Sequence, residues 1–296
     1  MLMIIAVLLV FGLCLGSFVN ALVWRLRQQE YQLEVHKVEK SEAKSRSTLN
    51  AQRSTQDRYS ILRGRSMCPH CEHELAAKDL VPLFSWLSLK GKCRYCAKPI
   101  AVQYPLVELI TALLFLASYI WWPTALTGSQ VAIFVLWLVL LVGLIALTVY
   151  DLRWLLLPDR IMYPLGLLAT IQAVIAITAA SRPAIALLNT VLAVAIGGGM
   201  FYILFQVSDG KWIGGGDVKL GWLLGLVVAT PARSLLFIFL AAVLGSLVSI
   251  PLLATKRMKR TSTIPFGPFL IGAAIIVVLF GAHILNWYQH TLLNLS

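Results

Sequence analysis

Two aspartates stand at the ends of long apolar runs, which is an unusual place for a charged side chain. Asp217 directly follows the glycine run Gly214–Gly216, and Asp151 directly follows the apolar run Val131–Tyr150. A carboxylate beside hydrocarbon costs free energy, so its presence there points to a function. Two carboxylates that share one proton can activate a water and polarise a peptide carbonyl. The pair therefore predicts hydrolytic chemistry of the aspartyl protease type at a membrane edge.

The glycine run should shape the surface on which a substrate lies. Glycine permits positive φ angles and lets another chain approach the backbone closely. We therefore expect Gly214, Gly215 and Gly216 to contact the substrate, with Asp217 at the first position of the next helix. That position favours Asp217 as the general base. Lys219 pairs with a carboxylate or a lipid phosphate in this interpretation, and it is a further candidate for substrate binding.

Asp159 is the alternative to Asp151 as the first aspartate of the pair. It lies beside Pro158 at the start of the next apolar run, where it would also serve as a helix N-cap. Asp151 taken alone has a simpler interpretation, an interfacial carboxylate paired with Arg153. The glycine run before Asp217 favours the catalytic interpretation of Asp151.

The composition predicts a protein that crosses a membrane several times. The 296 residues are 59% hydrophobic, with a mean hydropathy of +0.80, and runs of about 20 apolar residues have the length of membrane spans. The sixth run is short, and its Gly221 and Gly225 form a G-x-x-x-G pattern typical of close helix packing. We expect an all-α polytopic membrane protein with about eight transmembrane helices, near residues 2–24, 105–122, 129–150, 161–179, 184–206, 218–231, 233–254 and 267–288.

Basic residues indicate the orientation of these spans. If the N-terminus lies outside, 23 of the 25 Lys and Arg residues fall on one side, and only Arg182 and Arg233 fall on the other. Cytoplasmic loops carry the excess of basic residues, so that side is predicted to be cytoplasmic. Both aspartates then lie at the cytoplasmic face of the membrane.

The chain divides into three parts on this interpretation. Residues 1–24 form the first transmembrane helix, 25–103 a cytoplasmic domain, and 104–296 the membrane-embedded core. Residues 28–66 are polar and predict a surface helix or a mobile segment. Their basic side chains favour contact with anionic lipids, because lipid head groups lie nearer than any nucleic acid.

Four cysteines in the cytoplasmic domain have the spacing of a metal site. Cys68 and Cys71 form one C-x-x-C hook, Cys93 and Cys96 form a second, and 21 residues separate the hooks. Four thiolates close a tetrahedral shell, which is typical of structural zinc and leaves no open position for catalysis. Two disulfides are the alternative, but a reducing cytoplasm disfavours them.

These motifs together resemble the bacterial type IV prepilin peptidases, which are bifunctional leader peptidases and N-methyltransferases. The run from Gly214 to Lys219 is similar to the G-x-G-D signature that this family shares with preflagellin peptidases and the presenilin class. The resemblance covers most of the chain and is carried by Gly16–Asn20 with Trp24–Leu26, Arg65–Cys71, Leu83–Leu87, Gly91–Cys96, Tyr104–Glu108, Asp151–Asp159 and Gly214–Lys219.

The resemblance implies an intramembrane aspartic endopeptidase of the bacterial inner membrane. Its substrates would be type IV prepilins and type II secretion pseudopilins, which carry a short basic leader ending in glycine before a hydrophobic helix. The family cleaves after that glycine and then methylates the new N-terminal amine with S-adenosylmethionine. Asp151 and Asp217 would be the catalytic pair, and Cys68, Cys71, Cys93 and Cys96 the zinc ligands.

Glu108 is a further candidate, because it stands near the start of the second span. It would contact the basic leader or the methyl donor. A preflagellin-type leader peptidase without methyltransferase activity is the alternative function, although such proteins generally lack the four-cysteine domain. A transporter or an inactive scaffold is a weaker alternative, because several spans are nearly bare of polar residues and both aspartates are present.

Overall fold

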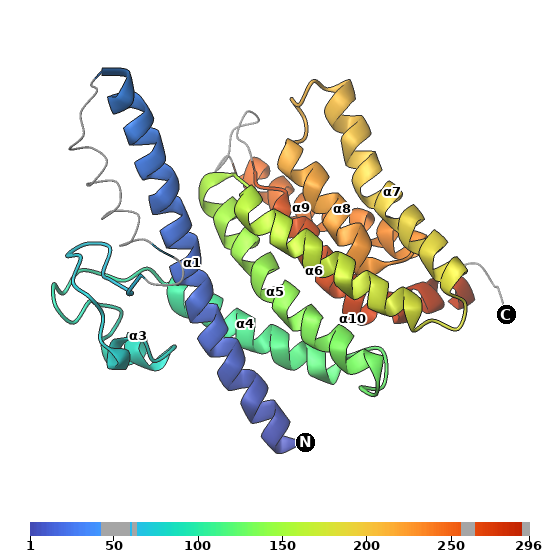
Figure 1. The fold of residues 1–296 in the computed structure, drawn as a ribbon, viewed down its shortest axis with the longest axis horizontal. Helices are drawn as coiled ribbons and strands as arrows, with labels where there is room; N and C mark the ends of the chain where they lie inside the picture. Colours follow the sequence, from blue (N-terminus) through green and yellow to red (C-terminus); the bar gives the residue numbers. More distant parts are fainter. Residues whose placement is uncertain (43–59, 61–63, 256–263, 292–296) are drawn as a thin grey trace. The chain divides into compact units, whose positions relative to one another are not determined.

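The computed structural model describes residues 1–42, 60, 64–255 and 264–291, and these residues confirm the all-α prediction. Among them there is no strand, and the only extended pairing is two isolated β-bridges (Figure 1). The chain divides into two compact units, Met1–Leu116 and Ala117–Ser296, so the division falls inside a helix.

The first unit contains a long N-terminal helix and the four cysteines. The helix α1 runs from Leu2 to Glu42, well beyond the predicted span end near residue 24. The polar segment 28–66 is therefore helical in its first part, and most of its remainder lies outside the described residues. The other elements are the short helices η1 (Ala77–Asp79) and α3 (Phe84–Ser88) and the membrane helix α4 (Gln103–Ile120).

Two glycines let α1 and α4 approach closely. A Cβ atom added to Gly12 would lie 2.5 Å from the Cα of Ala112, and one added to Gly16 would lie 2.6 Å from the Cα of Glu108. Backbone atoms cannot move away cheaply, so side chains at these two positions would push the helices apart. Gly12 and Gly16 form a second G-x-x-x-G pattern, which membrane helices use for close packing.

The described part of the second unit is a bundle of six helices. Among the described helices of the whole chain, seven are long and apolar enough to cross a membrane. The sixth predicted span, near residues 218–231, is not among these seven and corresponds to α8, whose 14 residues extend about 21 Å. The expectation of a short sixth span is thus confirmed. The helices of this unit are α5 (Ser129–Trp154), α6 (Asp159–Thr178), α7 (Pro183–Val207), α8 (Gly215–Val228), α9 (Pro231–Ala254) and α10 (Gly267–Thr291).

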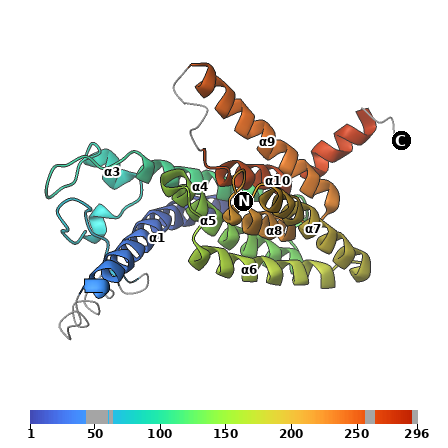
Figure 2. The same cartoon turned by 90° about the horizontal axis from the view of Figure 1, so that it is seen from above.

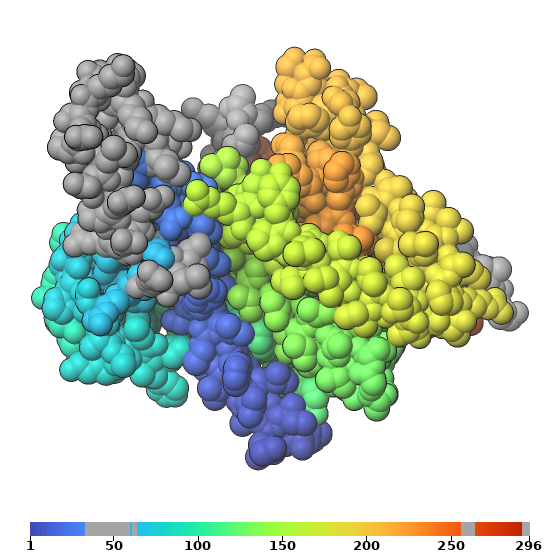
Figure 3. Space-filling model, in the orientation of Figure 1, coloured from blue at the N-terminus to red at the C-terminus, as the bar shows by residue number. Residues whose placement is uncertain are grey.

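The helices of the second unit differ greatly in how deeply they are packed. Half of the most apolar window of α5 is buried, against 11% of the corresponding window of α9. Near its C-terminal end, α9 extends away from the other helices of this unit (Figure 2). On the face visible in Figure 3, side chains fill the space between α6 and α7. Among the seven candidate spans, the helix that bears Asp151 therefore has the largest buried share.

Glycines also bring α7 and α8 together, as the G-x-x-x-G pattern predicts. A Cβ atom on Gly225 would lie 2.8 Å from the Cα of Val194, and one on Gly197 would lie 2.8 Å from the carbonyl oxygen of Gly221. The two backbones are in contact along this seam. The seam fixes the height and rotation of α8, and α8 carries Asp217 in its first turn.

Candidate active site and metal centre

Asp151 lies inside a helix and not in the loop that follows it. The helix α5 continues to Trp154 and ends where Leu155 adopts the left-handed conformation, with φ of 55° and ψ of 37°. The side chain of Asp151 is buried, and the residue is 5% exposed. Its Oδ2 accepts a hydrogen bond of 3.1 Å from the amide of Gly267. Pairing with Arg153 was the alternative interpretation of Asp151, and the Arg153 guanidinium lies over the ring of Trp154.

Asp217 is the third residue of α8 and not the first, because the helix begins at Gly215 with Gly214 as its N-cap. Gly214 has φ of −74°, and none of the three glycines has a positive φ. The positive φ that glycine permits is therefore not used at these three positions, and their contact with a substrate stays a prediction. A Cβ atom on Gly216 would lie 3.1 Å from the Cβ of Leu157.

The two aspartates come together at one site. Their carboxylates are close enough for the charge of Asp151 to act on Asp217. The side chain of Leu157 lies between the segments, since it contacts the backbone of Gly216 and also the position where Gly267 would carry a Cβ atom, 3.6 Å away. The segments that carry Asp151 and Asp217 therefore meet at Leu157, and the catalytic pairing of the two aspartates stays a prediction.

Asp159 takes part in a different interaction. Its carboxylate oxygens accept hydrogen bonds of 2.6 and 2.9 Å from Nζ of Lys219. The same Nζ lies 5.6 Å from the centre of the Tyr163 ring. Pro158, and not Asp159, is the N-cap of α6. Asp159 and Lys219 are both partly exposed and form an ion pair that connects α6 to α8 beside the site.

Glu108 and Asn20 are buried polar residues of the first unit. Glu108 accepts a hydrogen bond of 2.8 Å from the amide of Leu83 and another from the side chain of Ser17. The amide nitrogen of Asn20 donates to the carbonyl oxygens of Gly16 and Tyr104. Its Oδ1 is buried and has no hydrogen-bond partner among the described residues.

The four cysteines converge as the spacing predicts. The Sγ atoms of Cys68, Cys71, Cys93 and Cys96 all lie within 4.8 Å of one another, and those of Cys68 and Cys96 are 3.9 Å apart. A tetrahedral zinc ion with Zn–S bonds of about 2.3 Å places its sulfur ligands about 3.8 Å apart. The four thiols therefore have the separation that zinc requires, and none of them is in a disulfide.

The two cysteine hooks repeat one backbone geometry with an offset of 25 residues. In the first, the amide of Cys68 donates to the carbonyl of His73, and the amide of Glu72 donates to the carbonyl of Cys68. The second makes the equivalent bonds at positions 93 to 98 and at 97 to 93. Glu72 and Ala97 occupy the same place, with φ of 55° and 56°.

The second hook favours a thiolate at Cys93. Although burial raises the pKa of this thiol, hydrogen bonds from the backbone of Cys96 and Tyr95 lower it to about 7. The thiolate is the form that binds a metal. A neighbouring turn holds the same hook in place, because the carboxylate of Asp79 accepts hydrogen bonds from Arg94 at 2.6 Å and Tyr95 at 3.0 Å.

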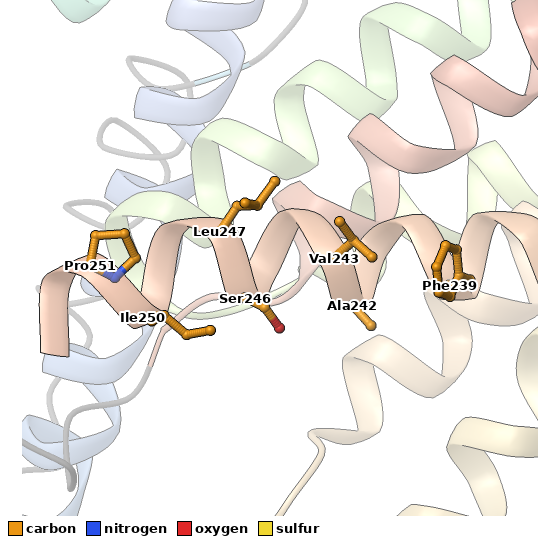
Figure 4. A pocket seen from close by; sticks show the side chains of 7 residues that line it. All are labelled: Phe239, Ala242, Val243, Ser246, Leu247, Ile250 and Pro251. Carbon is orange, nitrogen blue, oxygen red and sulfur yellow. The ribbon is translucent and has the colours of Figure 1, made fainter. Parts of the chain in front are cut away.

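A groove along α9 is a further concave feature of the second unit. It has a volume of about 380 Å³ and runs from Phe239 to Pro251 along one side of the helix (Figure 4). Ser246 is the only polar side chain in its lining. Without an ionisable group, this groove has no means to catalyse hydrolysis.

Sequence reasoning missed two glycines, Gly267 and Gly16. Gly267 stands between Phe266 and Pro268 where the last apolar run begins, and a glycine before proline at a helix start was a usable signal. Gly16 was noted only within a family motif, although Gly12 lies four residues before it. Neither residue is ionisable, so a search for reactive side chains passes over both.

Comparisons with known proteins agree with these two units. Residues 10–122 match the bacterial peptidase A24 N-terminal domain, and residues 138–250 match the type IV leader peptidase family. The first match contains all four cysteines, and the second contains both aspartates of the pair.

Several curated proteins are similar over nearly their whole length. A prepilin leader peptidase/N-methyltransferase of Aeromonas hydrophila is 34% identical over 94% of this chain and 91% of its own. A type 4 prepilin-like proteins leader peptide-processing enzyme of Escherichia coli O78:H11 is 34% identical, with 92% of each chain covered. A prepilin leader peptidase/N-methyltransferase of Bacillus subtilis is 29% identical over 77% of this chain and 87% of its own.

No solved structure matches the chain. The family assignment rests on the two domain matches and on the relatives that are similar across both units. The chain belongs to the type IV leader peptidase family, in the bacterial group that carries the peptidase A24 N-terminal domain.

Proposed function

We propose that this protein removes the leader peptide from prepilins and pseudopilins and then methylates the new N-terminus. Asp151 and Asp217 are the catalytic pair. The observation that supports this assignment is the convergence of their segments, because Asp151 is buried and bonded to Gly267, and Leu157 lies against both Gly267 and Gly216, the residue before Asp217. The curated relatives carry the same activity in their names.

Hydrolysis needs no covalent intermediate at such a pair. One carboxylate is ionised and removes a proton from a water, which attacks the carbonyl carbon of the scissile bond. The other is protonated and donates a hydrogen bond to the carbonyl oxygen. When the intermediate collapses, the carbon–nitrogen bond breaks and the leaving amine takes up a proton. The substrate backbone lies against Gly214, Gly215 and Gly216, which leave room for it.

The ion pair between Lys219 and Asp159 sits beside this site and serves a supporting role. Lys219 lies two residues after Asp217 near the start of α8, and its partner Asp159 belongs to α6. Because Asp159 neutralises Lys219, the pair adds no net positive charge that would repel the basic leader. Lys219 therefore contributes to substrate binding through its placement and takes no part in proton transfer.

Methyl transfer belongs to the first unit. Here Glu108 and the unpartnered Oδ1 of Asn20 offer hydrogen-bond acceptors in a buried setting. Such acceptors suit the N-terminal amine of a cleaved pilin, which must be held before it is methylated. S-adenosylmethionine supplies the methyl group when it is bound.

Zinc has a structural role in this proposal. Cys68, Cys71, Cys93 and Cys96 would hold it as four thiolates, which leave no open coordination position for a substrate. The small cysteine domain has little apolar surface to bury, so metal binding supplies the free energy that orders it.

The site works at the cytoplasmic face of the bacterial inner membrane. The support is the distribution of Lys and Arg, which puts the cysteine domain and both aspartates on one side. Added protease should therefore cut the cysteine domain in inside-out vesicles and spare it in intact spheroplasts. The opposite pattern would refute the orientation.

Cleavage of a purified prepilin in detergent tests the catalytic pair. We expect Asp151→Asn and Asp217→Asn each to lower the cleavage rate by about 10³-fold or more. Asp159→Asn should keep cleavage within about threefold of the wild type, because Asp159 pairs with Lys219. An active Asp151→Asn variant together with an inactive Asp159→Asn variant would move the active site to the start of α6.

Methyl transfer is tested separately on a pilin that is already cleaved. We expect Glu108→Gln to reduce incorporation of the labelled methyl group while prepilin cleavage continues. Asp151→Asn should show the reverse, with methylation retained and cleavage lost. Equal loss of both activities in Glu108→Gln would assign Glu108 to the fold of the first unit and remove it from the methylation site.

A further inference from the structure

The helix α10 packs against both helices that carry the aspartates. It contacts α5, which bears Asp151, and α8, which bears Asp217. Its first residue is Gly267, and this glycine is buried. The start of α10 therefore reaches the carboxylate of Asp151 from a place 116 residues further along the chain.

The amide of Gly267 is free to bind a residue outside its own helix. The first four N–H groups of a helix have no partner within it. The Gly267 N–H donates to Oδ2 of Asp151 at 3.1 Å. The terminal torsion of an aspartate is broad, so a bond to one oxygen restricts its rotation. That bond leaves Oδ1 to act on the water or on the scissile carbonyl.

The position has to be glycine because of space and not because of backbone conformation. Gly267 does not adopt a positive φ. A Cβ atom there would lie 2.6 Å from Oδ2 of Asp151 and 3.4 Å from its Cγ. These atoms form the end of a short side chain, so the carboxylate can turn away and relieve the clash. A methyl group at residue 267 would thus misplace the carboxylate and leave the helices where they are.

We propose that Gly267 is a positioning residue for peptide hydrolysis. Its amide fixes one oxygen of Asp151, and its missing side chain leaves the room in which the carboxylate adopts the working orientation. The proposal rests on the proposed function of Asp151 as one of the catalytic pair. It adds a third segment, the start of α10, to a site otherwise built from the ends of α5 and α8.

The test compares Gly267→Ala with a matched control in the same helix, Gly272→Ala. A Cβ atom on Gly272 would meet no atom within 4 Å, so this variant makes the same chemical change without the clash. Each full-length variant is purified in detergent beside the wild type and Asp151→Asn. Prepilin cleavage gives kcat and KM, and methylation of a cleaved pilin and the thermal midpoint report on the fold.

We expect Gly267→Ala to lower kcat by about 10²-fold, because a displacement of about 1 Å at a reacting group has an effect of that size. KM should stay within about threefold of the wild type, and methylation and the thermal midpoint should not change. Gly272→Ala should match the wild type in every measurement.

Two results would overturn the proposal while the proposed function stands. The first is a Gly267→Ala variant that cleaves within threefold of the wild type, while Asp151→Asn is inactive. The second is a raised KM with unchanged kcat, which would make Gly267 a substrate contact. A wild type that cleaves no prepilin would instead refute the proposed function itself.

Hydrogen exchange keeps the proposal testable if Gly267→Ala does not fold. In protein labelled with ¹⁵N-glycine, the Gly267 amide should exchange slowly in the wild type and at least tenfold faster in Asp151→Ala. The Gly272 amide should exchange equally slowly in both, because it lies inside the helix. Equal exchange of the Gly267 amide in the two proteins would refute the hydrogen bond and with it the positioning role.

Discussion

The cysteine domain and the aspartate site are built in opposite ways. Each cysteine hook is completed within a few residues, and the same hydrogen bonds recur in both hooks. The aspartate site draws on three segments that are far apart in sequence, around residues 151, 217 and 267. A local site can be recognised from spacing alone, whereas a site assembled by helix packing depends on the whole bundle.

The largest expected effect concerns the local site. Replacing Cys68 with Ser removes one of four thiolates, and structural zinc contributes roughly 10–16 kcal/mol to folding of such domains. We expect the variant to lose its single equivalent of zinc, measured by elemental analysis, and to accumulate at a much lower level. Cys14→Ser is the control, because Cys14 lies exposed on α1 away from the cluster. A stable, zinc-free Cys68→Ser protein would contradict a structural metal.

The next effect tests whether the aspartate site depends on helix packing. In Gly225→Ala the added Cβ atom would press on the backbone of Val194 in α7, so α8 must shift. We expect a loss of about 1–3 kcal/mol in the free energy of unfolding, together with reduced cleavage.

Gly199→Ala is the control for that packing change. Gly199 lies in α7, the helix that contains Val194, but a Cβ atom added to it would meet nothing within 4 Å. Alanine favours a helix over glycine by up to about 1 kcal/mol, so this variant should be as stable as the wild type or more so. If both variants behave alike in urea titrations, the glycine seam does not position α8.

A smaller effect separates two roles of Asp151. Its carboxylate accepts the first amide of α10, and an asparagine can accept the same bond whereas an alanine cannot. Both Asp151→Asn and Asp151→Ala should be inactive. The Asn variant should be more stable by about 1 kcal/mol, which is the usual value of a helix cap. Equal thermal midpoints for the two variants would show that the bond adds nothing to stability.

The smallest effect belongs to the ion pair of Lys219 and Asp159. Both side chains are more than 40% exposed, so water screens their attraction. Lys219→Met should therefore change the free energy of unfolding by less than about 1 kcal/mol. A loss of several kcal/mol in chemical denaturation would mean that α6 and α8 depend on this pair far more than its exposure suggests.

The elements that were predictable from the sequence are those with a local signal. The apolar runs located the membrane helices to within a few residues at most ends, and the cysteine spacing located the four thiols that converge. The predicted span ends near residue 150, because Asp151 and Arg153 are charged, as residues in loops often are. The helix α5 continues to Trp154. A polar residue such as Asp151 can lie inside a helix and be buried when another helix supplies its hydrogen-bond donor, here the amide of Gly267 in α10.

The contribution of Gly267 was missed for a different reason, although its place before a proline at a helix start was a usable signal. Gly267 acts through its backbone amide and through the absence of a side chain. Any glycine has both features, so the residue type alone does not single out this one. The glycines before Asp217 show that a glycine can also be noticed without its structural role being predicted. These glycines permit a positive φ, but none of the three adopts one. At Gly216 the missing side chain instead leaves room for Leu157.

The shortness of α8 has a consequence for the supply of water to the reaction. Its 14 residues extend about 21 Å, whereas the hydrocarbon layer is about 30 Å thick. A bilayer adapts to a short helix by thinning around it. We therefore expect hydration from the head groups to reach deeper beside α8 than beside the longer helices. Each round of hydrolysis consumes one water molecule, and Asp217 stands in the first turn of a helix that is too short to cross the hydrocarbon layer.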